Sequence, residues 1–185
     1  MPPRPMTLTR PLVLVGMMGA GKTAIGGAVA RKLGVPFLDS DEELVRAANR
    51  SIAEIFERDG EAFFRARETE VISRLLDGVP AVLSTGGGAF LSEANRAMID
   101  EKAVSVWLKA DLPLLWDRVR HKKTRPLLRT DDPLATLTEI YNARIPVYSL
   151  AKLSVEARAE YSIDTMADKV IKTLKDAQLL KDAET

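Results

Sequence analysis

The stretch GMMGAGKT, residues 16–23, decides how the rest of the sequence is interpreted. It matches the phosphate-binding pattern Gly-x-x-x-x-Gly-Lys-Ser/Thr, and it lies between the apolar run 12–15 and a helical pattern, as this motif requires. Glycine permits the positive φ angles that turn successive backbone N–H groups toward one point, and the following helix directs its positive end there. The sequence therefore predicts a polyphosphate-binding loop between a strand and a helix.

The loop also predicts individual roles. Lys22 is expected to reach the β- and γ-phosphates of a nucleotide, and the Thr23 hydroxyl is expected to ligate Mg²⁺. The residues expected to surround the nucleotide phosphates are Gly19, Ala20, Gly21, Lys22, Thr23 and Ala24.

Composition limits the partners and the location. A net charge of +1 over 185 residues indicates neither a nucleic-acid partner nor a membrane partner. The absence of cysteine, with only one histidine, excludes a disulfide framework, thiol catalysis and a Cys/His zinc site. No stretch approaches the roughly twenty apolar residues of a membrane span, and the proline-rich opening does not resemble a signal peptide. We expect a cytoplasmic protein that acts as a monomer.

The pattern along the chain is that of an α/β protein. Residues 1–9 are expected to form a disordered tail, and residues 10–185 a single domain. Strand-like runs at 12–15, 35–38, 81–83 and 103–108 alternate with helical patterns, which favours a parallel sheet. The run 161–163 is favoured over 153–155 as the last strand, before a closing helix over 167–180. A capping box at Ser51 and Glu54 predicts a short helix to about residue 58, separated by Asp59-Gly60 from a longer one.

Acidic residues follow the second strand. Ligands of open α/β sheets bind beyond the carboxyl ends of the strands, so Asp39 and Asp41 are expected at the same edge as the phosphate-binding loop. Two carboxylates beside a triphosphate require a cation, so Asp39 is predicted to help hold Mg²⁺, directly or through water. Asp41 is predicted to face an acceptor hydroxyl. The alternative is that Asp39, Ser40 or Asp41 caps the next helix, and both interpretations can hold for different residues.

Three further segments are candidates for anion binding. Arg65 and Glu68 share a helix face, and Arg65 is either a solvated charge or an anion ligand. The glycines at 86–88 follow a buried strand and offer free N–H groups, or else form a flexible connection. Between Arg118 and Arg129 the apolar periodicity vanishes, and this basic segment is predicted to be a lid, at about residues 118–132, that excludes water. Its alternative is a solvated basic surface.

Together these motifs resemble those of the shikimate kinase family, from about residue 13 to the last helix. GMMGAGKT is similar to that family's nucleotide loop, FLDSD (37–41) to its Asp-x-Asp, and DGEAFFRARE (59–68) to its Gly-Glu-x-x-Phe-Arg-x-x-Glu segment. STGGGA (84–89) is similar to its triple-glycine turn, TRPLL (124–128) to its lid, and NARIPVY (142–148) to its late arginine motif. The resemblance implies a P-loop kinase of the nucleoside monophosphate kinase group. Its fold is a three-layer sandwich, with a five-stranded parallel sheet flanked by helices and a mobile lid.

The resemblance also implies an activity, the phosphorylation of the 3-hydroxyl of shikimate by ATP with Mg²⁺. Lys22, Asp41 and Arg125 would be catalytic, with Arg125 reaching the transferring phosphate from the lid and Asp41 binding shikimate hydroxyls. Arg118 would stack on adenine. The substrate carboxylate would be held by Arg65, Gly86, Gly87, Gly88 and Arg144. One departure is that residues 163–167 lack the arginine and proline often found in the family's adenine-contacting loop.

Two other functions are weighed against this one. A kinase for gluconate or a nucleoside monophosphate would share the loop, but Asp41 with Arg65 and Arg144 favours a hydroxylated carboxylate, because an acceptor phosphate gains nothing from a facing aspartate. A GTPase switch is disfavoured because no Asn-Lys-x-Asp motif occurs and no Asp-x-x-Gly follows the loop.

Overall fold

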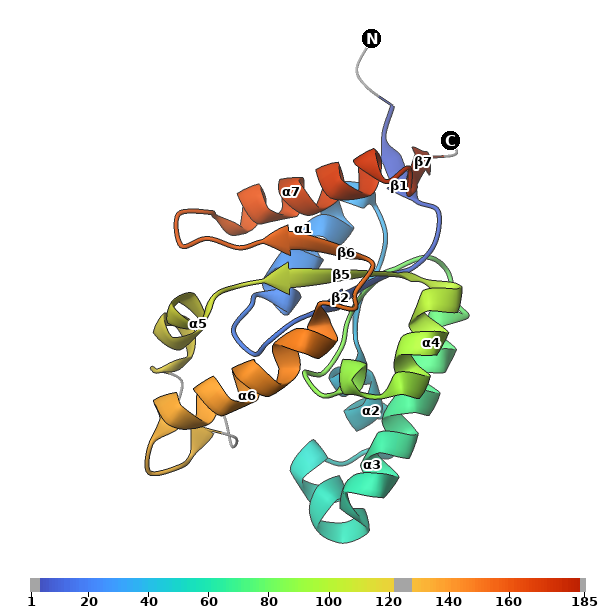
Figure 1. Ribbon diagram of the computed structural model, residues 1–185. Helices are drawn as coiled ribbons and strands as arrows, with labels where there is room; N and C mark the ends of the chain where they lie inside the picture. Colours follow the sequence, from blue (N-terminus) through green and yellow to red (C-terminus); the bar gives the residue numbers. More distant parts are fainter. Residues whose placement is uncertain (1–3, 122–127, 184–185) are drawn as a thin grey trace.

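Five parallel strands form the centre of the computed structural model, which describes residues 4–121 and 128–183 (Figure 1). Their order in the sheet is β3 (Phe37–Asp39), β4 (Val82–Ser84), β2 (Leu12–Val15), β5 (Val104–Lys109) and β6 (Leu153–Glu156). Every residue of the central strand β2 is buried, because helices cover both faces of a parallel sheet. The predicted five-stranded parallel sheet flanked by helices is confirmed.

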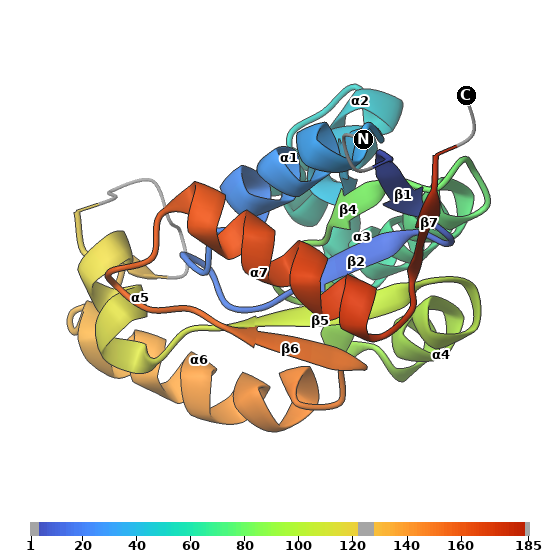
Figure 2. The ribbon, with the colours of Figure 1, turned by 90° about the horizontal axis from the view of Figure 1, so that it is seen from above.

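Helices form a layer on each side of the strands. Helices α1 (Lys22–Leu33) and α7 (Ile163–Asp176) lie side by side over one face, as Figure 2 shows. Helices α4 (Glu93–Lys102) and α6 (Pro133–Tyr148) lie on the other side, with α5 (Leu112–Val119) beyond the carboxyl end of β5 (Figure 1). Among the described residues, no helix is long and apolar enough to cross a membrane.

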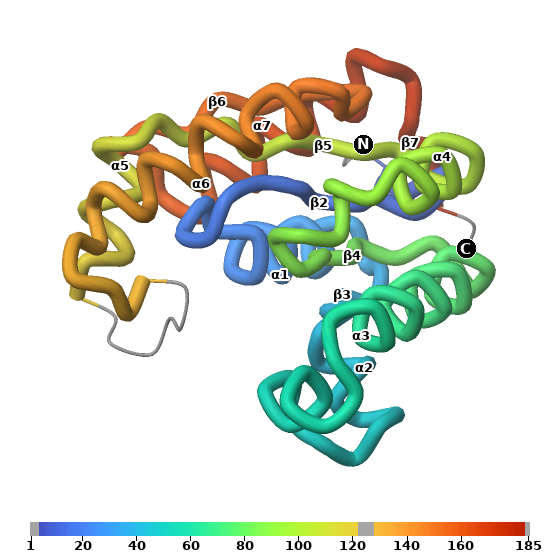
Figure 3. Tube along the Cα trace, turned by 60° about the horizontal axis from the view of Figure 1, so that its bottom comes forward, coloured from blue at the N-terminus to red at the C-terminus, as the bar shows by residue number. Residues whose placement is uncertain are grey.

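Two helices extend beyond the sheet at its β3 edge. Helices α2 (Ser40–Ala48) and α3 (Ile52–Leu76) lie next to β3 in Figure 3, and they share a small core of their own made by Leu44, Ile55, Phe64 and Val71. Ser51 caps α3, and Gly60 interrupts it with φ 84° and ψ 173°. The predicted break between a short and a longer helix is therefore confirmed.

The last strand differs from the prediction. Strand β6 forms from residues 153–156, not 161–163, because Leu153 to Glu156 pair with Val106 to Lys109 of β5. In the run 161–163, the Ser162 side chain instead accepts a hydrogen bond from the Thr165 N–H and begins α7. Helix α7 consequently runs over 163–176 rather than 167–180. Serine is favoured at the N-cap of a helix, and at Ser162 this preference outweighs the tendency of its apolar neighbours to form a strand.

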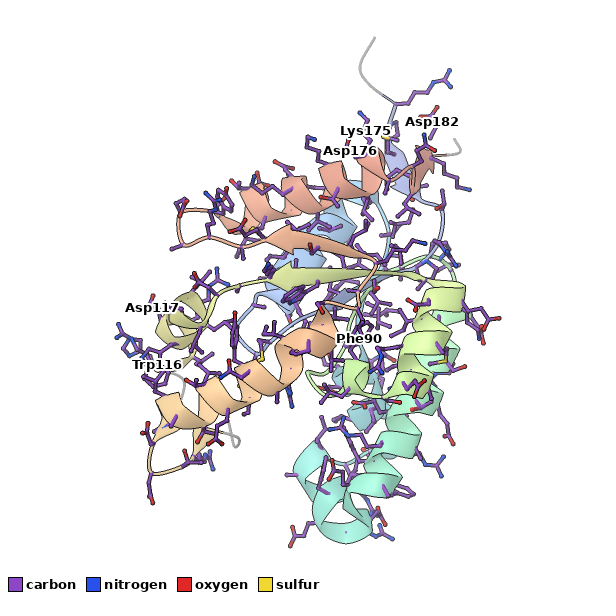
Figure 4. All side chains as sticks on the ribbon, viewed as in Figure 1. Phe90, Trp116, Asp117, Lys175, Asp176 and Asp182 are labelled. Atoms are coloured by element: carbon purple, nitrogen blue, oxygen red, sulfur yellow. The ribbon has the colours of Figure 1, made fainter. Side chains whose placement is uncertain are left out.

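The prediction that residues 1–9 form a disordered tail is also wrong in part. Strand β1 (Met6–Leu8) pairs antiparallel with β7 (Leu180–Asp182), and Leu8 is only 1% exposed. Figure 4, in which Asp182 is labelled, shows this pair at the opposite end of the molecule from Trp116 of α5. Three residues are too short a run to predict a strand, and the partner strand lies at the other end of the chain.

Candidate active site

A cavity of about 1150 Å³ opens where the phosphate-binding loop and the carboxyl ends of β3 and β4 meet helices α3, α5, α6 and α7. Most of the predicted site residues line it: Gly19, Gly21, Lys22, Thr23, Ala24, Asp39, Asp41, Arg65, Gly86, Gly87, Gly88, Arg118 and Arg144. Ala20 is fully buried behind the loop instead of lining the cavity. Arg125 lies outside the described residues.

The phosphate-binding loop has the backbone that its glycines predict. Gly19 and Gly21 have φ angles of 82° and 94°, which residues with a β-carbon rarely adopt. The Lys22 ammonium donates hydrogen bonds to the carbonyl oxygens of Gly16, at 2.6 Å, and Met17, at 3.3 Å. The ammonium group therefore lies across the loop, against its backbone.

Helix α5 is fastened to this loop. Arg118 donates from Nη1 to the Gly19 carbonyl at 3.0 Å, and a β-carbon on Gly19 would lie 2.7 Å from Cγ1 of Val119. The first two residues of the predicted lid, Arg118 and Val119, thus belong to α5 and pack directly on the phosphate-binding backbone. Arg118 lines the cavity beside Tyr161, Ile163 and Met166, which supply aromatic and apolar surface where the family's arginine and proline are lacking.

Asp39 has two roles open to it. Its Oδ1 accepts hydrogen bonds from the backbone N–H groups of Asp41, at 2.9 Å, and Glu42, at 3.2 Å, so the capping alternative is correct for this residue. Its carboxylate also lines the cavity together with Thr23. A hydroxyl and a carboxylate are oxygen ligands of the kind that Mg²⁺ takes, with phosphates and water completing the shell. Among the described residues, no group of three or more His, Cys, Asp or Glu side chains is placed so that it could hold a metal ion.

The triple-glycine turn touches all three predicted acceptor-binding side chains. A β-carbon on Gly86 would lie 2.8 Å from Oδ1 of Asp41, one on Gly87 would lie 2.8 Å from Nη1 of Arg144, and one on Gly88 would lie 2.5 Å from Nη2 of Arg65. No side chain fits at these positions unless a charged group moves away. The turn is glycine-rich because Asp41, Arg65 and Arg144 lie against its backbone.

Side chains from three helices hold this turn. The Ser40 hydroxyl of α2 accepts from the Gly86 N–H at 3.3 Å, and the Tyr148 hydroxyl of α6 donates to the Gly87 carbonyl at 2.7 Å. The buried Asn95 amide of α4 donates to the Ala89 carbonyl at 2.9 Å. Each bond satisfies a polar group that has few other partners at this depth. The turn is therefore an ordered segment and not the flexible connection that the sequence left open.

Arg65 is held by a buried carboxylate. Its Nη1 lies 2.9 Å from Oε1 of Glu68, a side chain that is only 2% exposed. Burial raises the pKa of Glu68, and the hydrogen bond and charge of Arg65 lower it, while the charge of Asp41 raises it further. Arg65 and Glu68, which were expected to share a helix face, do so and form an ion pair. Its position was visible in the sequence, but the burial of Glu68 was not.

Asp41 has the properties of a base. Burial raises the pKa of its carboxyl, the neighbouring charge of Asp39 raises it further, and the charges of Lys22 and Arg65 lower it. A carboxylate with a raised pKa accepts a proton from a hydroxyl more readily than an exposed one does. The same residue lies against the turn and faces the cavity that the phosphate-binding loop lines.

Similarities to known proteins agree with this geometry. The family model for shikimate kinase matches residues 18–175. A shikimate kinase of Ruegeria pomeroyi is 68% identical over 90% of this chain and 86% of its own length. One from Cereibacter sphaeroides is 63% identical over 90% of this chain and 83% of its own.

Solved structures extend the comparison. A shikimate kinase from Acinetobacter baumannii in complex with shikimate superposes with a TM-score of 0.84 at 36% identity, covering 92% of this chain and 95% of that one. A gluconokinase from Sinorhizobium meliloti has a TM-score of 0.62 at 16% identity, covering 92% and 94%, and so shares the fold alone. A family model that spans most of the chain, and relatives this similar, agree with the residues around the cavity: the chain belongs to the shikimate kinase family.

Proposed function

We propose that this protein transfers the γ-phosphate of ATP to the 3-hydroxyl of shikimate, giving shikimate 3-phosphate and ADP, on the route to chorismate and the aromatic amino acids. The observation that carries the proposal is the contact of Asp41, Arg65 and Arg144 with one turn, Gly86 to Gly88, inside the cavity that also holds the phosphate-binding loop. The relative from Acinetobacter baumannii, whose structure contains shikimate, supports the choice of acceptor.

The acceptor half of the site suits a hydroxylated carboxylate. Guanidinium groups bind carboxylates through paired, charge-assisted hydrogen bonds, and Arg65 and Arg144 approach the turn from different helices. Asp41 accepts a hydrogen bond from the attacking hydroxyl, orients it, and takes its proton as the bond to phosphorus forms. This division of labour explains why a carboxylate lies among the cations that bind the acceptor.

The donor half neutralises and positions the triphosphate. Lys22 exchanges its two loop carbonyls for phosphate oxygens, which charge makes the stronger acceptors. Thr23 and Asp39 hold Mg²⁺, which supplies neutralisation of the phosphate charge when it is bound. Arg118 stacks on the adenine, and Arg125, outside the described residues, reaches the transferring phosphate from the lid.

We further propose that the protein acts as a monomer in the cytoplasm, where ATP and Mg²⁺ are supplied. The support for a monomer is that one chain provides every residue assigned to the described part of the site. Size-exclusion chromatography with light scattering tests the monomer, and a mass of two chains or more would contradict it. Cell fractionation tests the location, and recovery of the protein outside the cytoplasmic fraction would contradict that part.

A coupled assay of ADP release tests the activity with shikimate, gluconate and a nucleoside monophosphate as acceptors. We expect release only with shikimate, and dependence on Mg²⁺. A matched pair separates the two halves of the site: Arg65→Ala should lose shikimate turnover while retaining ATP binding, and Lys22→Ala should lose turnover at saturating shikimate. Faster turnover of gluconate than of shikimate would overturn the assignment.

A further inference from the structure

A buried tyrosine lies next to the acceptor half of the site without belonging to it. Tyr148 is the last residue of α6, four residues after Arg144, and is only 1% exposed. Its ring lies near the indole of Trp107 in β5, with 6.5 Å between centroids. The ring is therefore buried and packed on the side of the sheet.

The hydroxyl reaches the middle of the triple-glycine turn. It donates to the Gly87 carbonyl at 2.7 Å, the usual length of an O–H···O hydrogen bond. Burial raises the pKa of the Tyr148 phenol, although the charge of Arg144 and its hydrogen bond to the phenol oxygen lower it. The phenol therefore keeps its proton at neutral pH, donates to Gly87, and accepts from Arg144.

Holding this carbonyl also sets the direction of an N–H group. The Gly87 carbonyl and the Gly88 N–H belong to one planar peptide unit, and no peptide bond in the described residues is cis. In a trans peptide the two groups point in opposite directions, so a carbonyl directed at Tyr148 turns the Gly88 N–H away from it. Within the described residues that N–H donates to no protein acceptor, and Gly88 lines the cavity.

The turn needs the hydrogen bond from Tyr148 because its backbone is built from glycine. Neither Gly87 nor Gly88 has a side chain to restrict its backbone, and the turn must keep its shape while Arg65 and Arg144 lie against it. A β-carbon on Gly87 would lie 2.8 Å from Nη1 of Arg144 and 3.8 Å from the Tyr148 oxygen, so these three groups form one cluster. A substitution of Tyr148 is therefore expected to alter both the position of Arg144 and the peptide unit after Gly87.

We propose that Tyr148 is a positioning residue for the acceptor carboxylate. Its hydroxyl fixes both the peptide unit between Gly87 and Gly88 and the Arg144 guanidinium, so that an N–H donor and a cation are already in place when the acceptor binds. This inference rests on the proposed role of the turn and Arg144 in holding the carboxylate. It assigns to Tyr148 an effect on acceptor affinity and none on nucleotide affinity.

The test is Tyr148→Phe, which removes one oxygen and keeps the ring against Trp107. We expect the KM for shikimate to rise about tenfold, as is typical when a buried acceptor loses its donor, with the KM for ATP changed less than about twofold. The matched control is Tyr141→Phe on the same helix, whose hydroxyl has no hydrogen-bond partner among the described residues. That variant should keep both KM values.

Other outcomes have defined meanings. A lowered melting temperature with both KM values unchanged, or with both raised equally, would show a merely structural role and overturn the proposal. Arg144→Lys separates this failure from failure of the proposed site. If it raises the KM for shikimate and Tyr148→Phe does not, only the role of Tyr148 is lost, but if neither does, the assignment of the carboxylate site is wrong too.

The double variant tests whether Tyr148 acts through Arg144. If it does, the KM of the double variant should rise by less than the product of the increases from Tyr148→Phe and Arg144→Lys. The reason is that both substitutions weaken the same interaction, that of Arg144 with the acceptor carboxylate. Full multiplication of the two effects would contradict positioning of Arg144 by the phenol.

Discussion

Asp41 shows how burial and catalysis oppose each other at a single residue. Its ionised form is disfavoured by burial and by Asp39, and it is favoured less strongly by Lys22 and Arg65. Folding therefore raises the pKa of this carboxyl, so the charge that the proposed reaction would require destabilises the folded protein at neutral pH. A neutral residue of the same shape should stabilise the protein and inactivate it.

Asp41→Asn tests this trade-off. We expect turnover to fall about 10²- to 10⁴-fold, with ATP affinity unchanged, because the variant lacks the general base that we propose. The melting temperature at pH 7 should rise. That gain should shrink as the pH falls through the raised pKa and vanish below the ordinary carboxyl pKa of about 3.9, where Asp41 is protonated in both states.

Thermal unfolding from about pH 3 to about pH 8, beside steady-state kinetics at about pH 7, measures both effects. A collapse of ATP affinity with shikimate affinity intact would reverse the roles given to Asp39 and Asp41. A lower melting temperature at pH 7 would contradict the raised pKa.

Glu68 holds the guanidinium of Arg65, which we propose binds the acceptor carboxylate. Glu68→Gln keeps the shape of the side chain but removes its charge, so Arg65 loses a charge-assisted bond inside the protein. We expect the KM for shikimate to rise about tenfold and the KM for ATP to stay constant.

The same helix provides a matched control for this change. Glu70 pairs with Arg67 at 2.6 Å, but both side chains are more than half exposed, so Glu70→Gln should alter neither KM. Equal effects of the two substitutions on shikimate kinetics would show that the helix, and not the buried pair, is responsible.

At the scale of elements, the turn between β4 and the short helix η1 (Ala89–Leu91) receives hydrogen bonds from side chains of three helices, α2, α4 and α6. Gly88→Ala would place a β-carbon 2.5 Å from the Arg65 guanidinium, which must then move. We expect at least a tenfold rise in the KM for shikimate, with little change in the KM for ATP, as measured by the coupled assay. Gly78→Ala is the control, since its nearest contact is at 3.5 Å, and it should behave as the wild type.

The predicted lid is joined to the phosphate-binding loop by α5, through Arg118 and Val119. If Arg125 reaches the transferring phosphate from this segment, Arg125→Ala should reduce turnover about a thousandfold while the melting temperature stays unchanged. Arg120→Ala, which breaks a half-exposed ion pair with Asp117, controls for the loss of positive charge. A near-normal rate for Arg125→Ala would remove the lid arginine from the mechanism.

At the scale of the whole molecule, the pairing of β1 with β7 joins the two ends of the chain away from the site (Figures 1 and 4). Leu8→Ala should reduce the free energy of unfolding by about 2–5 kcal/mol, because removing most of a buried side chain leaves a cavity in its place. Both KM values should stay constant at a temperature where the variant is folded. The control is Leu150→Ala, at a residue that is 60% exposed, which should change stability little. Raised KM values for Leu8→Ala would show that the pairing of β1 with β7 affects the site.

The extent of successful prediction follows from the range of each signal. The phosphate-binding loop, the strand alternation and the break at Gly60 are local patterns, and the structure has them. The prediction failed for β1 and β6, where short runs become strands only because β7 and β5 lie beside them. The same limit hid Tyr148, because its hydroxyl bonds the Gly87 carbonyl of a turn that is distant in sequence.

The sequence by itself determined the class of fold and the conformation of the phosphate-binding loop, because such a loop depends on the order of its own residues and on the helix that follows. The tertiary structure alone decided that Asp41, Arg65 and Arg144 meet at Gly86 to Gly88, that Glu68 is buried, and that Tyr148 holds the turn. These contacts join separate elements, and burial, which shifts the pKa of Asp41 and strengthens each ion pair, arises only when those elements pack.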